Sequence, residues 1–251
     1  MKVFLSVAWL FIPLVLPAQQ EGKVIYRESF RMEVNTEGLD EDLRKMFGQM
    51  PKEQHFTRQL LFRDGEWLYA DAPDTSGTEA DVHPASGNIM FQMNIRRPES
   101  TLYGDSKRNR LLESKELYGR RFLISDTLPR FTWKMSAAQK RLGDYLVLKA
   151  TTLVDTQLVV AWFTPQIPVS FGPAGYGGLP GLILELSFDN GQRHIVATEV
   201  TLEPLPEGAM SPPDKGRKVT RERFLKIQEE KRKEFEQRSR GRRFEMIIRH
   251  D

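Results

Sequence analysis

The sequence predicts a mainly β fold: an antiparallel curved sheet or incomplete barrel with a short N-terminal helix near residues 39–50 and a basic C-terminal helix. Short segments alternate between apolar and polar residues with the two-residue period of strands. Turn sequences such as Asp64-Gly65 and Asp189-Asn190-Gly191 separate these segments. Many strands joined by short turns are typical of an antiparallel meander that curls upon itself.

In the first half of the chain, a predicted strand covers residues 24–34, where every second residue except Glu28 is apolar. Apolar residues then recur at helical spacing over residues 39–50, behind an acidic first turn, which predicts a short amphipathic helix. Two strands flank the Asp64-Gly65 turn. After a polar loop, the alternation typical of a strand returns over residues 89–95.

In the second half, further strands are predicted on both sides of Tyr118-Gly119. Two more are predicted over residues 145–154 and 157–164, separated by Asp155-Thr156. The next two predicted strands cover residues 182–188 and 193–202. Thr220 has a side chain that caps helices, so we expect the basic C-terminal helix to begin there.

The predicted domain organisation places one antiparallel β domain over residues 19–204. Residues 205–218 are rich in Pro and Gly and are interpreted as a linker. Residues 219–251 are predicted to form the basic helix and a tail strand, because alternation returns at residues 244–248.

Residues 1–18 have the pattern of a cleaved signal peptide: Lys2 gives a positive start, residues 3–15 are apolar, and Pro17-Ala18 precedes polar residues. This pattern predicts an exported protein of the periplasm or cell envelope. The alternative is an N-terminal membrane anchor, although the apolar run is shorter than the ~20 residues that span a bilayer. No other stretch is apolar enough to cross a membrane, so we expect no transmembrane segment after signal cleavage.

The chain contains no Cys, which excludes disulfides, thiolate metal sites, a Cys nucleophile and a lipid-acceptor Cys. Its formal net charge of +3 is too balanced to predict nucleic-acid binding. Positive charge is nevertheless concentrated in residues 215–243, which hold thirteen Lys or Arg and five Glu. Two interpretations stay open for this segment: a solvated or partner-facing helix, and a peripheral contact with an anionic membrane surface.

Residues 171–183 hold five Gly and two Pro and lead directly into an apolar strand. Glycine permits backbone angles closed to other residues and proline fixes φ, so the segment has a specified shape. Aromatic residues crowd the same region, and together they predict a rigid rim that contacts a ligand or partner. The alternative is structural, with a loop folded across a sheet edge and the rings packed in the core. The predicted contacts are Trp162, Phe163, Tyr176, Gly178, Leu179, Pro180, Gly181, Leu182 and Ile183.

No motif in the chain specifies a reaction. The glycine spacing imitates a dinucleotide fingerprint, but Pro180 replaces its last glycine and a strand follows where a helix is required. The histidines have no metal-ligand spacing, and the acidic loop around His83 lacks the order of a calcium loop. An enzyme would require two polar catalytic groups that converge in a pocket, and Glu185 or His194 buried beside another titratable group would favour that interpretation. We therefore predict no catalytic residue, no metal and no cofactor.

Residues 178–183 read Gly-Leu-Pro-Gly-Leu-Ile, and five further short motifs precede them along the chain. These segments are Trp133–Ser136, Gly143–Tyr145, Lys149–Thr151, Ala161–Pro168 and Gly172-Pro173. Over about residues 131–188 the chain resembles the GLPGLI family of exported proteins from Gram-negative bacteria. The resemblance implies an exported protein with a β fold and no assigned reaction. The apolar hairpins also resemble the curved sheets of periplasmic lipoprotein carriers.

From these observations we expect a non-catalytic binding or carrier protein. An apolar small molecule or an envelope protein segment would be buried in the concave face, with residues 178–183 as one rim. The first alternative is an interaction component of a cell-envelope complex without a ligand cavity, docking through the loop and the basic helix. A hydrolase is the second alternative.

Overall fold

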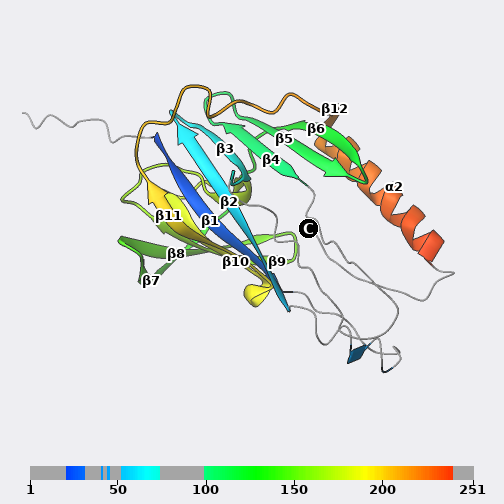
Figure 1. The fold of residues 1–251 in the computed structure, drawn as a ribbon. Coiled ribbons are helices and arrows are strands. Elements are labelled where there is room, and N and C mark those ends of the chain that lie inside the picture. The colour runs from blue at the N-terminus through cyan, green and yellow to red at the C-terminus, as the bar shows by residue number, and fades with distance from the viewer. Residues whose placement is uncertain (1–20, 32–40, 42–43, 46–51, 74–98, 240–251) are drawn as a thin grey trace, which may run out of the picture.

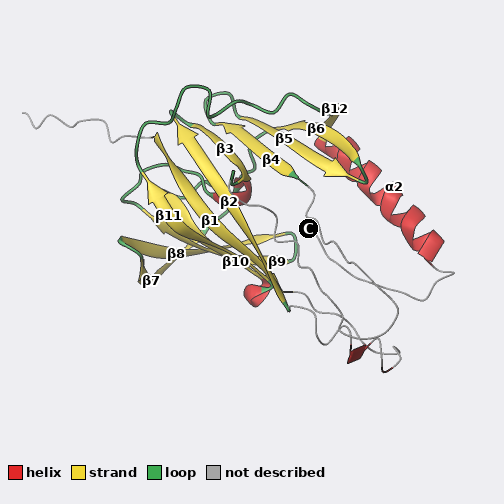
Figure 2. Ribbon diagram, in the orientation of Figure 1, coloured by secondary structure: helices red, strands yellow, loops and turns green. Residues whose placement is uncertain are grey.

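The fold is that of a computed structural model, which describes residues 21–31, 41, 44–45, 52–73 and 99–239. Within those residues the chain forms twelve strands, two short 3-10 turns and one long helix (Figures 1 and 2). The strands are β1 (Glu21–Arg31), β2 (Glu53–Arg63), β3 (Glu66–Asp71), β4 (Ser100–Asp105), β5 (Arg110–Leu117), β6 (Arg120–Asp126), β7 (Lys134–Leu142), β8 (Tyr145–Val154), β9 (Gln157–Thr164), β10 (Leu182–Phe188), β11 (Arg193–Thr201) and β12 (Arg217–Thr220). The 3-10 turns are η1 (Pro173–Gly175) and η2 (Asp189–Gly191), and the helix is α2 (Arg221–Ser239).

The described strands form one sheet in the order β12-β6-β5-β4-β3-β2-β1-β11-β10-β9-β8-β7. Neighbours pair antiparallel, except that β12 runs parallel to β6. The first strand is central, because β1 pairs with β2 on one side and with β11 on the other. The sheet curls without closing, since β12 and β7 remain its two edges (Figure 2). The predicted fold class, a mainly β curved antiparallel sheet with a C-terminal helix, is confirmed.

Three predicted hairpins are present, at Asp64-Gly65, Tyr118-Gly119 and Asp155-Thr156. Asp64 and Gly65 have φ angles of 51° and 87°. A two-residue turn of type I′ requires positive φ at both positions, which Asp and Gly adopt at low cost. The turn residues therefore determine where these strands reverse.

The sequence did not reveal β4, β7 or β12, because none of these strands shows a clear apolar alternation. β4 carries Gly104, where an added Cβ atom would overlap the Trp67 ring, so the glycine lets that ring cross the strand. β7 is an edge strand whose residues 134–139 are exposed. β12 has four residues and is formed by pairing with β6, inside a segment interpreted as linker and helix start.

The curl brings the inner faces of both halves of the sheet together in one core. Tyr26 and Phe62 come from one half, and Phe163 and Phe188 from the other, and all four are buried in the same cluster. The Tyr26 hydroxyl crosses this core and donates a 2.7 Å hydrogen bond to the carbonyl oxygen of Ile183. A polar link within the core therefore fixes the distance between the two halves.

The opposite face of β2–β5 is covered by residues 205–210. Leu205, Ala209 and Met210 pack there against Leu61, Leu68, Tyr103 and Leu112. Arg63 donates a 2.5 Å hydrogen bond to the carbonyl oxygen of Leu205. This part of the predicted linker thus lies against the sheet, because its apolar side chains pack on those of β2–β5.

The predicted C-terminal helix is confirmed as α2. Thr220 caps it, since its hydroxyl accepts a 3.3 Å hydrogen bond from the amide of Arg223. Phe224 is buried with its ring edge-to-face on Phe122 at 5.4 Å. Phe235, by contrast, is 62 % exposed. The first turns therefore anchor α2, and the remainder projects beyond the sheet (Figure 1).

Several predicted elements fall wholly or partly on residues that the structure does not describe. Of the predicted helix at residues 39–50, Glu41, Arg44 and Lys45 are described, and all three are helical. The predicted signal peptide at residues 1–18 and the strands at residues 89–95 and 244–248 lie outside the described residues.

The hydrogen bond across the core leads to a stability prediction. Tyr26→Phe is expected to lower the free energy of unfolding by about 1–3 kcal/mol, because the Ile183 carbonyl stays buried without its donor. Urea unfolding followed by circular dichroism measures the change. Tyr118→Phe is the matched control, since Tyr118 is 60 % exposed at a turn. Equal stabilities for both variants would contradict the role given to Tyr26.

Candidate functional site

The glycine- and proline-rich loop over residues 165–181 connects β9 to β10. It folds into the curl of the sheet, where Ile167, Val169, Phe171 and Leu179 are buried in the main core. The Phe171 ring lies 5.5 Å from the Phe62 ring. The Gly178 amide donates a 2.9 Å hydrogen bond to the Ser170 carbonyl oxygen, which folds the loop onto itself. The Leu182 amide donates another of 2.9 Å to the Ile167 carbonyl oxygen, which fixes the end of the loop. The loop is therefore an ordered insert whose own side chains occupy the core.

Glycines are required in this loop for close packing. A Cβ atom on Gly181 would overlap the Thr164 oxygen, and one on Gly172 would lie 2.5 Å from the Ile183 Cβ. Gly178 differs, because its φ is +87° but the nearest atom to its would-be Cβ is 3.9 Å away. Close packing thus explains Gly172 and Gly181, and backbone conformation alone explains Gly178.

The structure distributes the predicted contact residues over three environments. Phe163, Leu179, Gly181, Leu182 and Ile183 are buried, Gly178 and Pro180 are not, and Tyr176 is half-buried. Trp162 lies on the other face of β9 from Phe163, where the Lys140 ammonium sits 4.4 Å from its ring centroid. The nine residues therefore do not form one surface, and their role in contacting a ligand stays a prediction.

Tyr176 belongs instead to a continuous series of rings that we call the aromatic belt. The belt starts beside the loop, passes over the ends of β10 and β11, and reaches β1 and β2. The indole of Trp133 ties one end to the loop, donating a 2.8 Å hydrogen bond to the Gly177 oxygen. The contacts are Phe131–Trp133 at 5.9 Å, Phe131–Tyr176 at 4.7 Å and stacked, Tyr176–Phe188 at 5.4 Å, Phe188–Arg193 at 4.8 Å, Arg193–Phe30 at 5.4 Å and Phe30–Phe56 at 5.9 Å.

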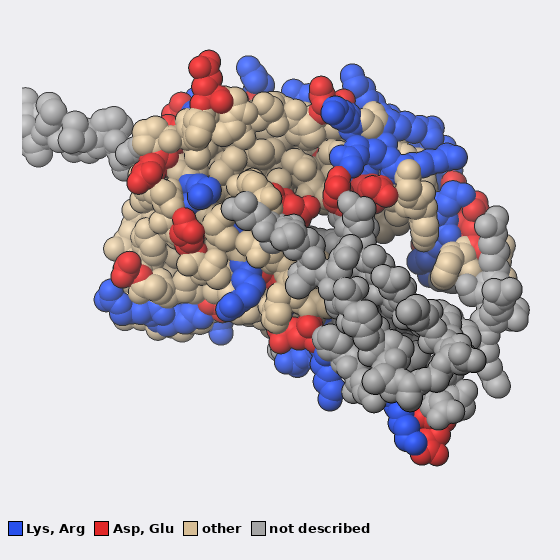
Figure 3. All heavy atoms as spheres, in the orientation of Figure 1, with Lys and Arg blue, Asp and Glu red and all other residues tan. Residues whose placement is uncertain are grey.

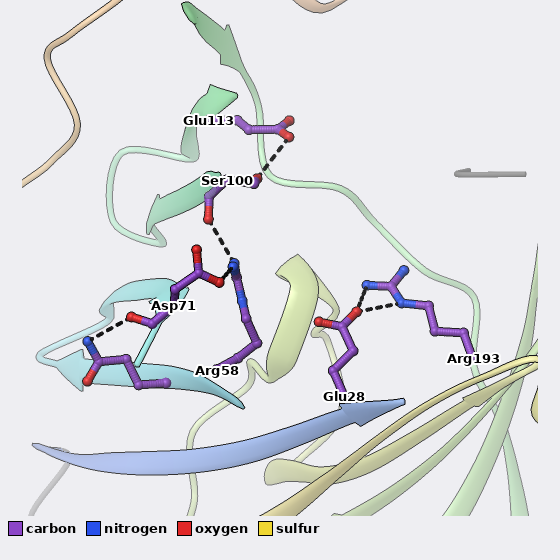
Figure 4. A network of polar contacts seen from close by, with 7 residues as sticks. Glu28, Arg58, Asp71, Ser100, Glu113 and Arg193 are labelled. Carbon is purple, nitrogen blue, oxygen red and sulfur yellow. Dashed lines mark hydrogen bonds and ion pairs between the residues drawn. The ribbon is translucent and has the colours of Figure 1, made fainter. Parts of the chain in front are cut away.

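Arg193 joins the two aromatic parts of the belt. Its Nε and a terminal nitrogen lie 2.8 and 2.7 Å from one carboxylate oxygen of Glu28 (Figure 4). Glu28 is fully buried, while the Arg193 side chain is 21 % exposed. Burial raises the pKa of the Tyr176 hydroxyl, although the charge of Arg193 opposes the rise. The belt therefore places half-buried rings on both sides of one guanidinium that its carboxylate partner holds in place, and Phe188 connects them from within the core.

A second polar network follows the inner face of β2–β5. Arg58, fully buried, pairs with Asp71 and donates a 2.8 Å hydrogen bond to the Ser100 carbonyl (Figure 4). Glu113 accepts a 2.7 Å hydrogen bond from Arg221, and Arg221 also reaches Asp126 at 3.2 Å. These bonds connect the strands to the first residue of α2, so this network supports the fold at one side of the belt.

Glu185 and His194 meet on the opposite face of the sheet. His194 Nε2 lies 3.1 Å from one Glu185 oxygen, and the Lys140 ammonium donates a 2.5 Å hydrogen bond to the other. Burial by itself would raise the pKa of Glu185, but the bonds from His194 and Lys140 outweigh it, and the pKa is lowered. Glu185 is thus held as a carboxylate, and both of its oxygens have partners.

Of the belt residues, only Tyr176 was among the contacts predicted from the sequence. Glu28 gave a signal, because it is the one polar residue in the inward row of β1. Arg193 gave none, since an arginine after a turn is ordinary, and its partner Glu28 lies 165 positions away in the chain. Phe131 and Phe188 were assigned to no site.

Among the described residues, no group of three or more His, Asp or Glu side chains is arranged to hold a metal ion. His83, the centre of the acidic loop considered above, lies outside them. The described part of the chain also has no helix that is both long and apolar enough to cross a membrane.

A family model described as "Protein of unknown function (Porph_ging)" matches residues 151–185. The match covers β9 and the loop that follows it, together with parts of β8 and β10. The matched residues lie within residues 131–188, for which the sequence predicts a family resemblance, and the family model has a different name. No curated protein matches the chain.

Solved structures with a similar fold include PNGF-II in two crystal forms. These match with TM-scores of 0.52 and 0.54 at 16 % identity, over 83 % and 84 % of this chain. The chain spans about a third of the length of PNGF-II, 33 % in both forms. An uncharacterised conserved protein from Thermus thermophilus matches with a TM-score of 0.40 at 8 % identity, over 81 % of this chain and 91 % of its own. The PNGF-II likeness supports the fold alone.

Two glycines of the loop make a matched pair of substitutions. Gly181→Ala is expected to prevent native folding or to destabilise the protein by about 4 kcal/mol or more, because its Cβ would overlap the Thr164 carbonyl. Gly178→Ala should cost only about 1 kcal/mol, the penalty for a positive φ. Thermal unfolding of both variants measures the difference. A Gly181→Ala protein as stable as Gly178→Ala would refute this packing.

The lowered pKa of Glu185 predicts a stability that depends on pH. Its folded pKa lies below the ordinary value of 4.5, so ionised Glu185 stabilises the fold above about pH 4.5. This contribution is lost as pH falls through the folded pKa. Glu185→Gln should therefore destabilise the protein at pH 7 and converge with wild type in acid. Urea titrations across this pH range test it, and a constant difference at every pH would contradict it.

Proposed function

We propose that this chain is a non-catalytic binding protein that holds an apolar ligand or an extended partner segment along the aromatic belt. The observation that carries the proposal is the series of contacts from Trp133 to Phe56, in which the guanidinium of Arg193 bridges two groups of rings. Aromatic side chains and arginine supply much of the binding energy at interfaces.

The belt is organised before a ligand arrives. Glu28 holds Arg193, and the ordered loop holds Trp133 through its carbonyl. Side chains that are already fixed lose little conformational entropy on binding, which favours affinity. The loop thus contributes to the proposed site by positioning rings, while its own apolar side chains pack into the core.

The belt favours binding over chemistry. Its carboxylate, Glu28, is fully buried and engaged by Arg193. Glu185 and His194 lie on the opposite face, and both Glu185 oxygens are bonded. The second candidate function is a docking component of a cell-envelope complex without a ligand cavity. The apolar side chains of the loop pack into the core, so this component would also dock through the belt. Export to the periplasm or cell envelope is part of this proposal and rests on residues 1–18.

An aromatic anionic dye is a direct probe of the belt. Fluorescence titration with 1-anilinonaphthalene-8-sulfonate should show binding to the wild type, because the dye offers rings to the belt and a sulfonate to Arg193. The double variant Phe131→Ala/Tyr176→Ala removes the stacked pair and should weaken dye binding by about tenfold.

Phe235→Ala is the control, since it removes an exposed ring from α2, away from the belt. It should leave the dye affinity unchanged. Circular dichroism confirms that each variant is folded. A folded double variant that binds the dye as tightly as the control would refute the belt as the binding site.

A further inference from the structure

One face of the β7–β9 hairpins carries a distinct set of side chains, which we call the lysine–leucine face. The register pairs Lys134 with Thr151, Lys149 with Trp162, and Leu153 with Leu158. Paired residues of an antiparallel sheet project to the same side. The core residues Val159, Ala161 and Phe163 alternate with these positions on β9 and project to the inner side. The register places Lys134, Lys149, Thr151, Leu153, Leu158, Val160 and Trp162 on the face, and its contact with the Trp162 ring adds Lys140.

Positive charge predominates on this face. Three lysines project from it, and β7, β8 and β9 contain no Asp or Glu. Glu185, on neighbouring β10, pairs with Trp162 and so projects to the same side, where it is bonded to Lys140 and His194. Lys134 and Lys149 form no ion pair with any other described residue. Figure 3 shows basic side chains gathered along the β7–β8 end of the sheet, at the lower left.

Large apolar side chains are exposed between these lysines. Leu153 and Leu158 form a cross-strand pair, and they are 68 % and 42 % exposed. Trp162 is half-buried beneath the Lys140 ammonium, 4.4 Å from its ring centroid. Residues 205–210 cover the corresponding face of β2–β5. No described residue covers Leu153 or Leu158 in that way.

We propose that the lysine–leucine face docks on an anionic phospholipid surface. Lysines near such a surface are attracted to its phosphate groups, and their long stems let the ammonium groups reach water. Leucine and tryptophan side chains enter the boundary between headgroups and acyl chains. A face with exposed leucines and two lysines that form no ion pair with a described residue has the complementary chemistry for that boundary.

The sequence left open a membrane contact through the C-terminal helix, and several cations of that helix have anionic partners in the structure. Three cations of α2 have partners within the helix, whereas Arg223 and Lys226 form no ion pair with a described residue. Lys231 pairs with Glu234, and Arg232 and Lys233 pair with Glu229. Arg221, at its start, is bound to Glu113 and Asp126. Lys134 and Lys149 keep their charge available, beside apolar side chains that the same surface would bury.

Vesicle flotation with the full chain tests the proposal. The protein should associate with vesicles of phosphatidylglycerol and phosphatidylcholine more strongly than with phosphatidylcholine alone, and added salt should weaken the association. Lys134→Gln/Lys149→Gln should lower the partition coefficient on the anionic vesicles by about twentyfold. Leu153→Ser/Leu158→Ser should lower it by about tenfold.

Arg217→Gln/Lys218→Gln is the matched control, because it removes the same charge from β12, the opposite edge of the sheet. It should bind the anionic vesicles like the wild type. The apolar residues 3–15 are common to every variant, so differences between variants report the face. A wild type without preference for anionic vesicles would overturn the proposal. Equal binding by both face variants and the wild type, or an equal loss in the control, would overturn it as well.

Discussion

The central constraint in this structure is the insertion of residues 165–181 between the two halves of a curled sheet. The insert supplies Phe171 and Leu179 to the core, and Gly181 lets its end pass within contact of the Thr164 carbonyl. Just after the insert, the carbonyl oxygen of Ile183 accepts a hydrogen bond from the Tyr26 hydroxyl across the core. The curvature of the sheet, the depth of the insert and the position of β10 are therefore coupled.

Much of the fold could be predicted because it follows from local patterns. The bounds of β8, β9 and β10 agree with the predicted segments, since alternation and turn residues act over a few positions. β7 and β12 have no such local pattern. They are strands because β7 pairs with β8 and β12 pairs with β6. The glycines and prolines indicated a rigid loop, but they did not show whether it folds into the core or out into solvent. It folds inward, which makes Leu179 a core residue. The belt depends on Glu28 and Arg193, which only the closed register of β1 and β11 brings together.

Charged residues inside the curl add specificity to an otherwise apolar interior. Arg58 and Glu28 are fully buried, and a buried charge is tolerated only with a partner in the right place. Glu28 needs β11 beside β1, and Arg58 needs β3 and β4 beside β2. A shift of one residue in any of these pairings would turn the charge away from its partner. The two networks therefore help select one register, while the rings and aliphatic side chains supply most of the cohesion.

The position of β1 has a consequence for how the molecule is assembled. Lys23 pairs with Leu61 on one side but with Thr201 on the other. The meanders β2–β6 and β7–β11 are built from neighbours in sequence, whereas the seam between them closes only after most of the polypeptide has been synthesised. Contacts of such long sequence separation slow folding. Until β11 arrives, the newly made chain carries an open hydrogen-bonding edge on its first strand, the kind of edge that promotes aggregation and that chaperones protect.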